Sequence, residues 1–67
     1  MDANTQIAAA ASAGFTARVH AASGRVYVKY DGKDAGYLLP SDDGTTGTCG
    51  NVTRRAGALA EALRAVR

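Results

Sequence analysis

The sequence predicts a single α+β domain, residues 1–67, in which a helix, a three-stranded antiparallel sheet and a second helix follow one another (αβββα). Segment 15–39 alternates apolar and polar residues around the dipeptides Ser23-Gly24 and Asp31-Gly32, which is typical of hairpins. An alanine-rich stretch precedes this segment, and apolar residues at three- and four-residue spacing follow it. So short a chain buries only about 60% of its unfolded surface, so we expect a thin core.

The alanine-rich segment 2–13 is expected to form the first helix. Asp2 or Asn4 can cap its N-terminus, alanine is the best helix former, and Gly14 is well placed to end the helix. Ile7 is its one large apolar side chain and therefore the expected anchor. The helix either covers an edge or face of the sheet or is an arm that orders on a partner.

Strands are expected at about residues 15–22, 25–31 and 35–39, and Pro40 ends the third strand because proline has no amide hydrogen to donate to a ladder. A two-residue turn at 23–24 fixes which side chains share a face, since side chains alternate along a strand. The expected apolar face consists of Ala17, Val19, Ala21, Val26, Val28, Tyr30, Ala35, Tyr37 and Leu39, and the opposite face receives Asp34, Gly36 and Leu38 from the third strand. A two- or four-residue loop after Tyr30 gives this assignment, whereas a three-residue loop would reverse it for the third strand.

The opposite sheet face is expected to be basic and aromatic. The two-residue turn places Arg18 opposite Lys29, and His20 opposite Tyr27. Either Asp34 neutralises this cluster and the face is merely solvated, or the face binds an anionic partner, because arginine and tyrosine are favoured at interface centres and on nucleic-acid-binding sheets. The partner-binding residues predicted on this face are Arg18, His20, Arg25, Tyr27 and Lys29.

The long segment 40–51 is rich in glycine, threonine and aspartate and is interpreted as a connecting and interaction loop. The spacing of Gly44, Gly47 and Gly50 before a helix offers bare amides to a phosphate. However, the lysine-serine/threonine ending of a P-loop and a parallel βαβ unit are both missing, so the connector interpretation is preferred and no cofactor is expected.

Residue types that carry chemistry are few. Asp42 and Asp43 lack the spacing of a calcium loop, and one histidine and one cysteine cannot form a zinc site or an internal disulfide, so no metal is expected. A thiol near a helix N-terminus can be activated, but His20 is expected on the sheet face away from Cys49. We therefore expect a buried or semi-exposed structural thiol and no enzyme.

The second helix is predicted over residues 52–66, with Asn51 or Thr53 as its cap, packed on the apolar sheet face. Arg54 and Arg55 lie at the end of this helix where the dipole disfavours positive charge, so they are further candidates for partner contacts. The apolar stripe expected to face the sheet consists of Val52, Ala56, Leu59, Leu63 and Val66.

Charge and hydropathy limit the function classes. The net charge of +2 and a pI of about 9.0 are compatible with nucleic acid but do not argue for it alone. Acidic residues in segments 31–34 and 42–43 and at Glu61 are expected to interrupt the positive field, which suits a protein partner better. No stretch has the length and apolarity of a membrane span or a secretory leader, so a cytoplasmic protein is expected.

Two resemblances follow from this pattern. Residues 15–66 resemble the arm-binding domains of phage integrases and AP2-type domains, which read DNA with an exposed sheet face. The resemblance rests on the C-terminal helix and on the residues Arg18, Arg25, Tyr27 and Lys29. That resemblance implies a nucleic-acid-binding module.

In general build, the whole chain resembles the compact anti-CRISPR proteins of phages and mobile elements, which are short, lack an active site and present a charged face and a glycine-rich loop. This resemblance implies an inhibitor that binds a subunit of a bacterial CRISPR effector complex inside the host cell, and it is preferred here, with the nucleic-acid-binding module as the alternative. Such an inhibitor blocks nucleic-acid binding or nuclease recruitment. A homodimer, through an open sheet edge or through apolar surface that the thin core cannot cover, is a further expectation.

Overall fold

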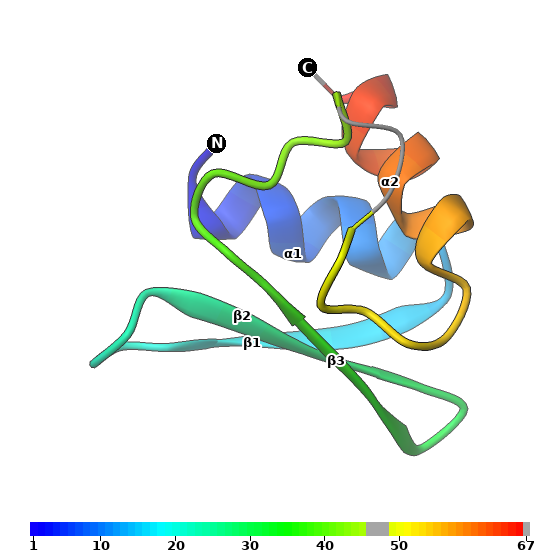
Figure 1. Ribbon diagram of the computed structural model, residues 1–67, viewed down its shortest axis with the longest axis horizontal. Helices are drawn as coiled ribbons and strands as arrows, with labels where there is room; N and C mark the ends of the chain where they lie inside the picture. The colour runs from blue at the N-terminus through cyan, green and yellow to red at the C-terminus, as the bar shows by residue number, and fades with distance from the viewer. Residues whose placement is uncertain (46–48, 67) are drawn as a thin grey trace.

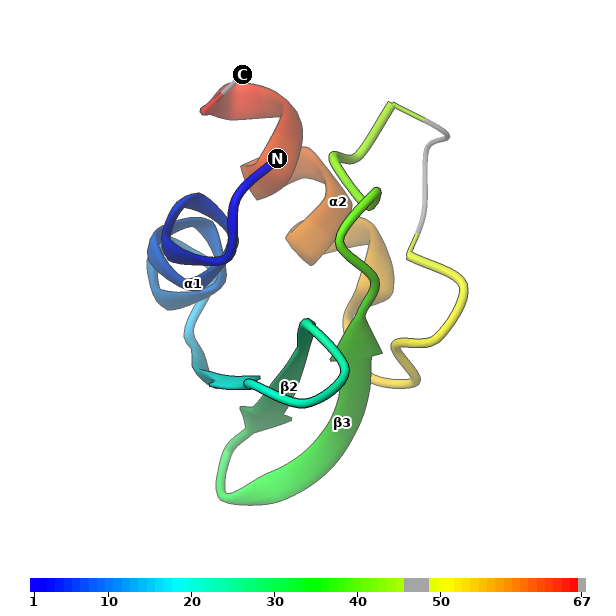
Figure 2. The ribbon, with the colours of Figure 1, turned by 90° about the vertical axis from the view of Figure 1, so that its left-hand side faces the viewer.

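The computed structural model describes residues 1–45 and 49–66 of the chain and confirms the αβββα arrangement. The two helices lie side by side on one face of the antiparallel sheet, whose strand order is β1-β2-β3, and the other face is left uncovered (Figures 1 and 2). The elements are α1 (Ala3–Ser12), β1 (Phe15–His20), β2 (Arg25–Tyr30), β3 (Lys33–Leu38) and α2 (Ala56–Ala65).

Helix α1 covers the sheet, as one of the two sequence interpretations expected, and packs against β1 and β2. Asp2 is its N-cap: the Asp2 Oδ1 atom accepts a hydrogen bond from the Thr5 amide at 2.7 Å, and this bond lowers the pKa of the Asp2 carboxyl. Gly14 follows the helix with a φ of +89°, a conformation that favours glycine.

The anchor of α1 is Gln6 rather than Ile7, which is only partly buried. The Gln6 Nε2 atom donates to the carbonyl oxygens of Leu39 and Asp42 at 2.9 and 2.8 Å. A polar side chain can occupy this core position because its amide satisfies two backbone acceptors of the turn that follows β3. The other buried residues of α1 are Ala9 and Ala10.

Strands β1 and β2 pair in a register two residues away from the predicted one. Val19 lies opposite Val26 instead of Val28, because residues 21–24 form a four-residue turn in which the His20 carbonyl accepts two backbone hydrogen bonds at 3.2 and 2.8 Å. A shift by two residues preserves the alternation of side chains, so the predicted faces of both strands are retained. Val19 itself is 47% exposed.

A β-bulge interrupts the pairing of β2 with β3. Lys29 lies opposite Asp34, but the preceding residue, Val28, lies opposite Gly36, so Ala35 is an extra residue on β3. Such an insertion reverses the faces of everything beyond it along the strand. The one local signal for it is Gly36, because an isolated glycine inside a strand pattern often marks a bulge or a close approach of another backbone.

The bulge corrects the predicted faces of the third strand. Leu38, expected on the polar face, is fully buried, and Tyr37, expected in the core, lies opposite Tyr27 on the uncovered face. Ala35 is buried as predicted, and Leu39 is half-buried just beyond the strand. The bulge thus places Leu38 in the core and half-buried Tyr37 on the uncovered face.

The segment 51–53 is a short extended strand beside β3, not the start of the second helix. Val52 forms an antiparallel bridge with Gly36, and the amides of Tyr37 and Thr53 donate to backbone carbonyls across the pair at 3.1 and 2.7 Å. The backbones approach so closely that a Cβ atom on Gly36 would lie 2.0 Å from a carbonyl oxygen. This segment, called the strap below, covers the outer edge of β3.

Helix α2 therefore begins at Ala56, four residues later than predicted. Neither Asn51 nor Thr53 is its cap; the N-cap is Arg55, which has a left-handed backbone (φ 49°, ψ 40°) and makes no capping hydrogen bond through its side chain. The buried residues of α2 are Leu59, Ala60 and Leu63. Val66, expected in the apolar stripe, is 45% exposed.

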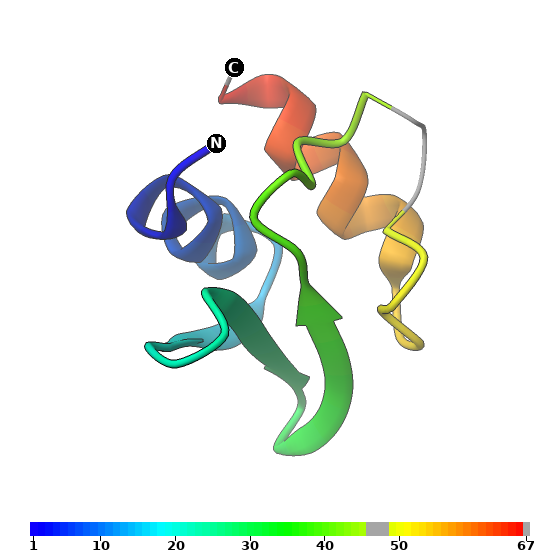
Figure 3. The same ribbon diagram turned by 60° about the vertical axis from the view of Figure 1, so that its left-hand side comes forward.

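After β3 the chain passes between the two helices before it reaches the strap (Figure 3). Gln6 holds this passage to α1, and the Arg64 NH1 atom donates to the Gly44 carbonyl at 2.8 Å and holds it to α2. The described part of the predicted loop is therefore docked on both helices. None of the described helices has the length and apolarity needed to cross a membrane.

The core lies between the helix layer and the sheet. Of the twelve buried hydrophobic residues among those described, four are alanines, so the core is thin, as expected. These residues are Ala9, Ala10, Phe15, Val26, Val28, Ala35, Leu38, Cys49, Val52, Leu59, Ala60 and Leu63.

Candidate functional site

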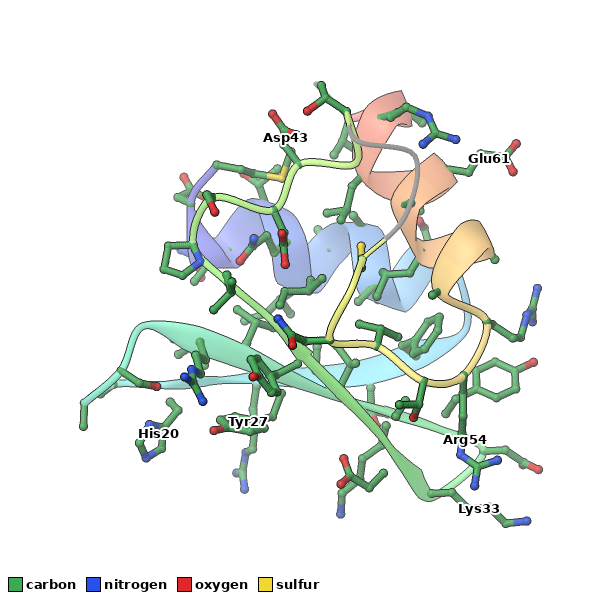
Figure 4. All side chains as sticks on the ribbon, in the orientation of Figure 1. His20, Tyr27, Lys33, Asp43, Arg54 and Glu61 are labelled. Atoms are coloured by element: carbon green, nitrogen blue, oxygen red, sulfur yellow. The ribbon has the colours of Figure 1, made fainter. Side chains whose placement is uncertain are left out.

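The uncovered face of the sheet carries five of the seven residues predicted to bind a partner. His20 and Tyr27 project from the sheet on the side away from both helices (Figure 4). We call this surface the basic sheet face, and it consists of Thr16, Arg18, His20, Arg25, Tyr27, Lys29, Asp34 and Tyr37.

Aromatic rings form a continuous row across this face. The ring centroids of Tyr27 and Tyr37 are 5.6 Å apart at an interplanar angle of 47°, and His20 meets the Tyr27 ring edge-on at 5.8 Å. The Arg25 guanidinium lies over the Tyr37 ring, 4.5 Å from its centroid. Such contacts hold large amphipathic side chains in place at little entropic cost to a later binding event. Tyr37 belongs to this row only because of the bulge in β3.

Cations flank the aromatic row in an arrangement that differs from the predicted one. Arg18 lies opposite Tyr27 rather than Lys29, and Lys29 lies between Thr16 on β1 and Asp34 on β3. Arg18 and Lys29 are thus not directly opposed. They therefore do not repel each other as like charges on facing strand residues would. Asp34 is the one acidic side chain in this set of described residues, and its Oδ1 atom accepts from the Gly36 amide at 3.2 Å.

A hollow with a volume of about 360 Å³ opens between these side chains. It brings together one carboxylate, two cations, a hydroxyl and an aromatic ring. Its lining residues are Thr16, Ala17, Arg18, Tyr27, Val28, Lys29 and Asp34.

The last two predicted residues, Arg54 and Arg55, have different roles. The Arg54 Nε atom donates to the Asp34 carbonyl at 3.3 Å, which places Arg54 beside Lys33 at the β3 side of the face (Figure 4). The Arg55 NH1 atom donates to the Tyr30 hydroxyl at 2.6 Å, and its guanidinium lies 5.0 Å from the Tyr30 ring centroid. Arg55 therefore supports the fold at the start of α2, whereas Arg54 extends the basic surface.

Charge is segregated between the two ends of the molecule. In Figure 4, Lys33 and Arg54 lie at the sheet end, and Asp43 and Glu61 lie at the opposite end beside α2. Only two of the six acidic residues, in segment 31–34, lie among the strands. Six of the eight basic residues of the chain belong to the strands and to the residues before α2: Arg18, Arg25, Lys29, Lys33, Arg54 and Arg55.

The positive field is therefore interrupted less than the sequence led us to expect. We call the strands, the turn 31–32 and residues 54–55 together the sheet end. This part carries six positive and two negative charges, a net charge of +4, which exceeds the +2 of the whole chain. The remaining acidic residues belong to the α1 cap, the segment after β3 and α2. A surface of this kind attracts anions although the protein as a whole is only mildly basic.

Cys49 and His20 are not brought together. Cys49 is buried in the core on the helix side, whereas His20 lies on the uncovered face, where its Nδ1 atom is 2.8 Å from the Ser23 hydroxyl. Burial raises the pKa of the Cys49 thiol, the charge of Asp42 raises it further, and Arg64 lowers it in part. The thiol is thus held in its protonated, unreactive form.

The other candidates for chemistry are structural in the described part of the chain. Gly44 is buried with a φ of +83°, and a Cβ atom there would lie 2.3 Å from the Ala60 carbonyl oxygen, so this glycine serves packing against α2. Gly47, the middle glycine of the predicted phosphate loop, lies outside the described residues. No group of three or more histidine, cysteine, aspartate or glutamate side chains able to hold a metal occurs in residues 1–45 and 49–66.

The basic sheet face, with its hollow and its aromatic row, is the surface on which a functional proposal can be based. Comparisons with protein-family models, with curated proteins and with solved structures found no match to this chain.

Proposed function

We propose that the chain is a small, non-enzymatic nucleic-acid-binding module that uses the basic sheet face. The observation that carries this proposal is the paired Tyr27 and Tyr37 rings with cations around them on a sheet that no helix covers on this side. Exposed rings on a sheet can stack with bases, at about 1–3 kcal/mol per base, and the surrounding cations can contact the phosphates.

Charge placement supports the same function. Net charge at the sheet end is +4, so a polyanion is attracted to the face that presents the rings. Each phosphate neutralised on a single strand contributes about −0.7 to the slope of log K against log salt. If four or five of these cations contact phosphates, the slope is roughly −3 to −3.5.

The test is fluorescence anisotropy with a labelled single-stranded oligonucleotide at several salt concentrations. We expect Tyr27→Ala to weaken binding about tenfold or more through lost stacking, and Lys29→Gln to weaken binding and reduce the salt slope by about 0.7. Arg64→Gln is the matched control, because it removes the same charge from α2 on the helix side. Equal effects of Lys29→Gln and Arg64→Gln would contradict the proposal, with circular dichroism used to check that each variant is folded.

A second candidate function is inhibition of a bacterial defence complex, and the open edge of β1 favours it. The strap pairs with β3, but no described segment pairs with the outer edge of β1, where Val19 is 47% exposed. An open strand edge can add a strand from a protein partner. On this proposal the chain acts in the bacterial cytoplasm, binds a CRISPR effector subunit and blocks nucleic-acid binding or nuclease recruitment, with Arg25 and Tyr27 as anchors.

A pull-down from a CRISPR-containing bacterial lysate, with and without nuclease, separates the two candidates. Recovery of effector subunits that survives nuclease and is lost in Val19→Lys supports the inhibitor. Recovery of mixed nucleic-acid-binding proteins that disappears with nuclease supports the nucleic-acid-binding module instead.

A further inference from the structure

Asp34 is out of place on a surface that serves only to attract phosphates. It is exposed, lies directly opposite Lys29 and lines the hollow together with Arg18 and Tyr27. A carboxylate at this position weakens general phosphate binding, yet it can accept two hydrogen bonds from a neutral donor group. We propose that the hollow binds one unpaired guanine of a single strand, an inference that rests on the proposed nucleic-acid-binding function.

The size of the hollow fits one nucleotide. A volume of about 360 Å³ lies near the lower limit of small-molecule sites, which range over about 300–1,000 Å³. Tyr27 contributes an aromatic ring to the wall, and a base in the hollow can stack on it. The neighbouring Tyr37 ring lies 5.6 Å from Tyr27, and the Arg25 guanidinium over it places a cation beside the stacked base.

The polar groups of the hollow favour guanine over adenine and cytosine. Guanine presents two adjacent donors, N1–H and the N2 amino group, to which the two oxygens of the Asp34 carboxylate are complementary. It also presents two adjacent acceptors, O6 and N7, which arginine or lysine recognises, and Arg18 and Lys29 both line the hollow. Adenine and cytosine place a ring-nitrogen acceptor beside their amino group, and this acceptor would face the carboxylate unfavourably.

The same geometry requires the guanine to be unpaired. The N1–H and N2 donors form the Watson–Crick edge, which is occupied in a duplex and accessible in single-stranded loops, bulges and ends. The hydrogen bond from the Gly36 amide holds the Asp34 carboxylate at the strand surface and leaves it further acceptor capacity. Single-stranded nucleic acid with an exposed guanine is therefore the ligand assigned to this site.

The experiment compares oligothymidine strands that each carry one central guanine, adenine, cytosine or hypoxanthine, measured by fluorescence anisotropy. We expect the guanine strand to bind about tenfold more tightly than the adenine and cytosine strands, and hypoxanthine, which lacks the N2 amino group, to lose most of that advantage. Annealing the complementary strand should abolish the guanine preference.

Two aspartate variants locate the preference. Asp34→Asn should bind all strands at least as tightly as the unmodified protein, because a negative charge is removed, but without preference for guanine. Asp31→Asn is the matched control: it removes the same charge from the β2–β3 turn, where the left-handed backbone (φ 55°) also suits asparagine, and should keep the preference.

The outcomes distinguish failure of the guanine site from failure of the proposed nucleic-acid-binding function. Equal binding of all strands by the unmodified protein, or a guanine preference that persists in Asp34→Asn, would overturn the guanine site while leaving nucleic-acid binding intact. Absence of binding to every strand at low salt would overturn both.

Discussion

At the residue scale, the protonation of Cys49 links burial to stability. The thiol is buried in the core, and this burial raises its pKa, so the neutral form is favoured in the folded state. Below the ordinary thiol pKa both the folded and the unfolded state keep the proton, and the difference has no effect on stability. Above it the unfolded state releases a proton that the folded state retains, so the free energy of unfolding falls as pH rises.

This predicts an alkaline loss of stability that depends on Cys49. Urea unfolding measured between about pH 8 and pH 10 should show a steeper fall for the unmodified protein than for Cys49→Ala, in which the titrating group is missing. Parallel curves for the two proteins would contradict the assignment. A thiol reagent should react slowly with the folded protein and at full rate in denaturant, which measures the burial of the thiol directly.

Single residues of the candidate site could be predicted from the sequence only where alternation along a strand decides their position. Arg18 and Tyr27 were placed on the correct face even though the register was wrong, because an error of two residues leaves every side chain on its face. The prediction that Tyr37 lies in the core is wrong, because the extra residue Ala35 reverses the faces of the strand beyond it. The position of Asp34 next to Lys29 is predicted correctly, because this pair lies between the Asp31-Gly32 turn and the bulge.

At the element scale, the strap explains why a glycine, Gly36, stands inside β3. Gly36 has a φ of +113°, and a Cβ atom there would lie 2.0 Å from the Asn51 carbonyl oxygen and 3.0 Å from the Val52 Cα atom. The neighbouring groups are backbone atoms, which cannot rotate away as a flexible side chain would. The approach of the strap to β3 is therefore possible only with glycine at this position.

We predict that Gly36→Ala destabilises the domain by about 3 kcal/mol or more, because it adds backbone strain and displaces the strap. Gly32→Ala is the matched control. It also has a positive φ, +75°, but nothing lies within 4 Å of its Cβ position, so about 1–2 kcal/mol is expected. Chemical denaturation of both variants measures the difference, and equal losses would show that the contact with the strap is unimportant.

Elements could be predicted where local signals were strong. Helix α1 follows from its alanines and the Asp2 cap, and the two hairpins follow from their turn dipeptides. The start of α2 could not be predicted, because residues 52–55 have acceptable helix propensity and only the tertiary pairing of Val52 with Gly36 extends them. Arg55 is thus held at the N-cap by its hydrogen bond to Tyr30, which gives its position near the helix start a structural reason.

At the scale of the whole molecule, the proposed binding surface is separated from the buried core. The helix side contains the core, the buried thiol and the passage 39–45, whereas the sheet end holds most of the positive charge. The N-terminus and the C-terminal end of α2 lie on the helix side, away from the basic sheet face (Figures 1 and 3). A ligand can therefore approach the sheet without meeting the N-terminus, and a tag for the binding experiments can be attached there.

The molecule should also unfold as one unit, because its small core joins every element. The radius of gyration is 10.0 Å, close to the value of about 11 Å expected for a compact chain of this length. Total stability for a domain of this size is roughly 3–10 kcal/mol. Leu63 on α2 and Leu38 on β3 are both fully buried in the same cluster. Loss of packing in the helix layer therefore also destabilises the sheet.

We therefore predict that Leu63→Ala lowers the free energy of unfolding by about 2–4 kcal/mol and does so for sheet and helices together. Circular dichroism follows the helices, and tyrosine fluorescence follows the sheet because the chain contains no tryptophan. The two urea transitions should coincide in both proteins and shift together in the variant. Val66→Ala, at an exposed position of the same helix end, should change stability by less than about 0.5 kcal/mol. Loss of the helix signal while the tyrosine signal persists would mean that the sheet, and with it the basic sheet face, is stable without α2.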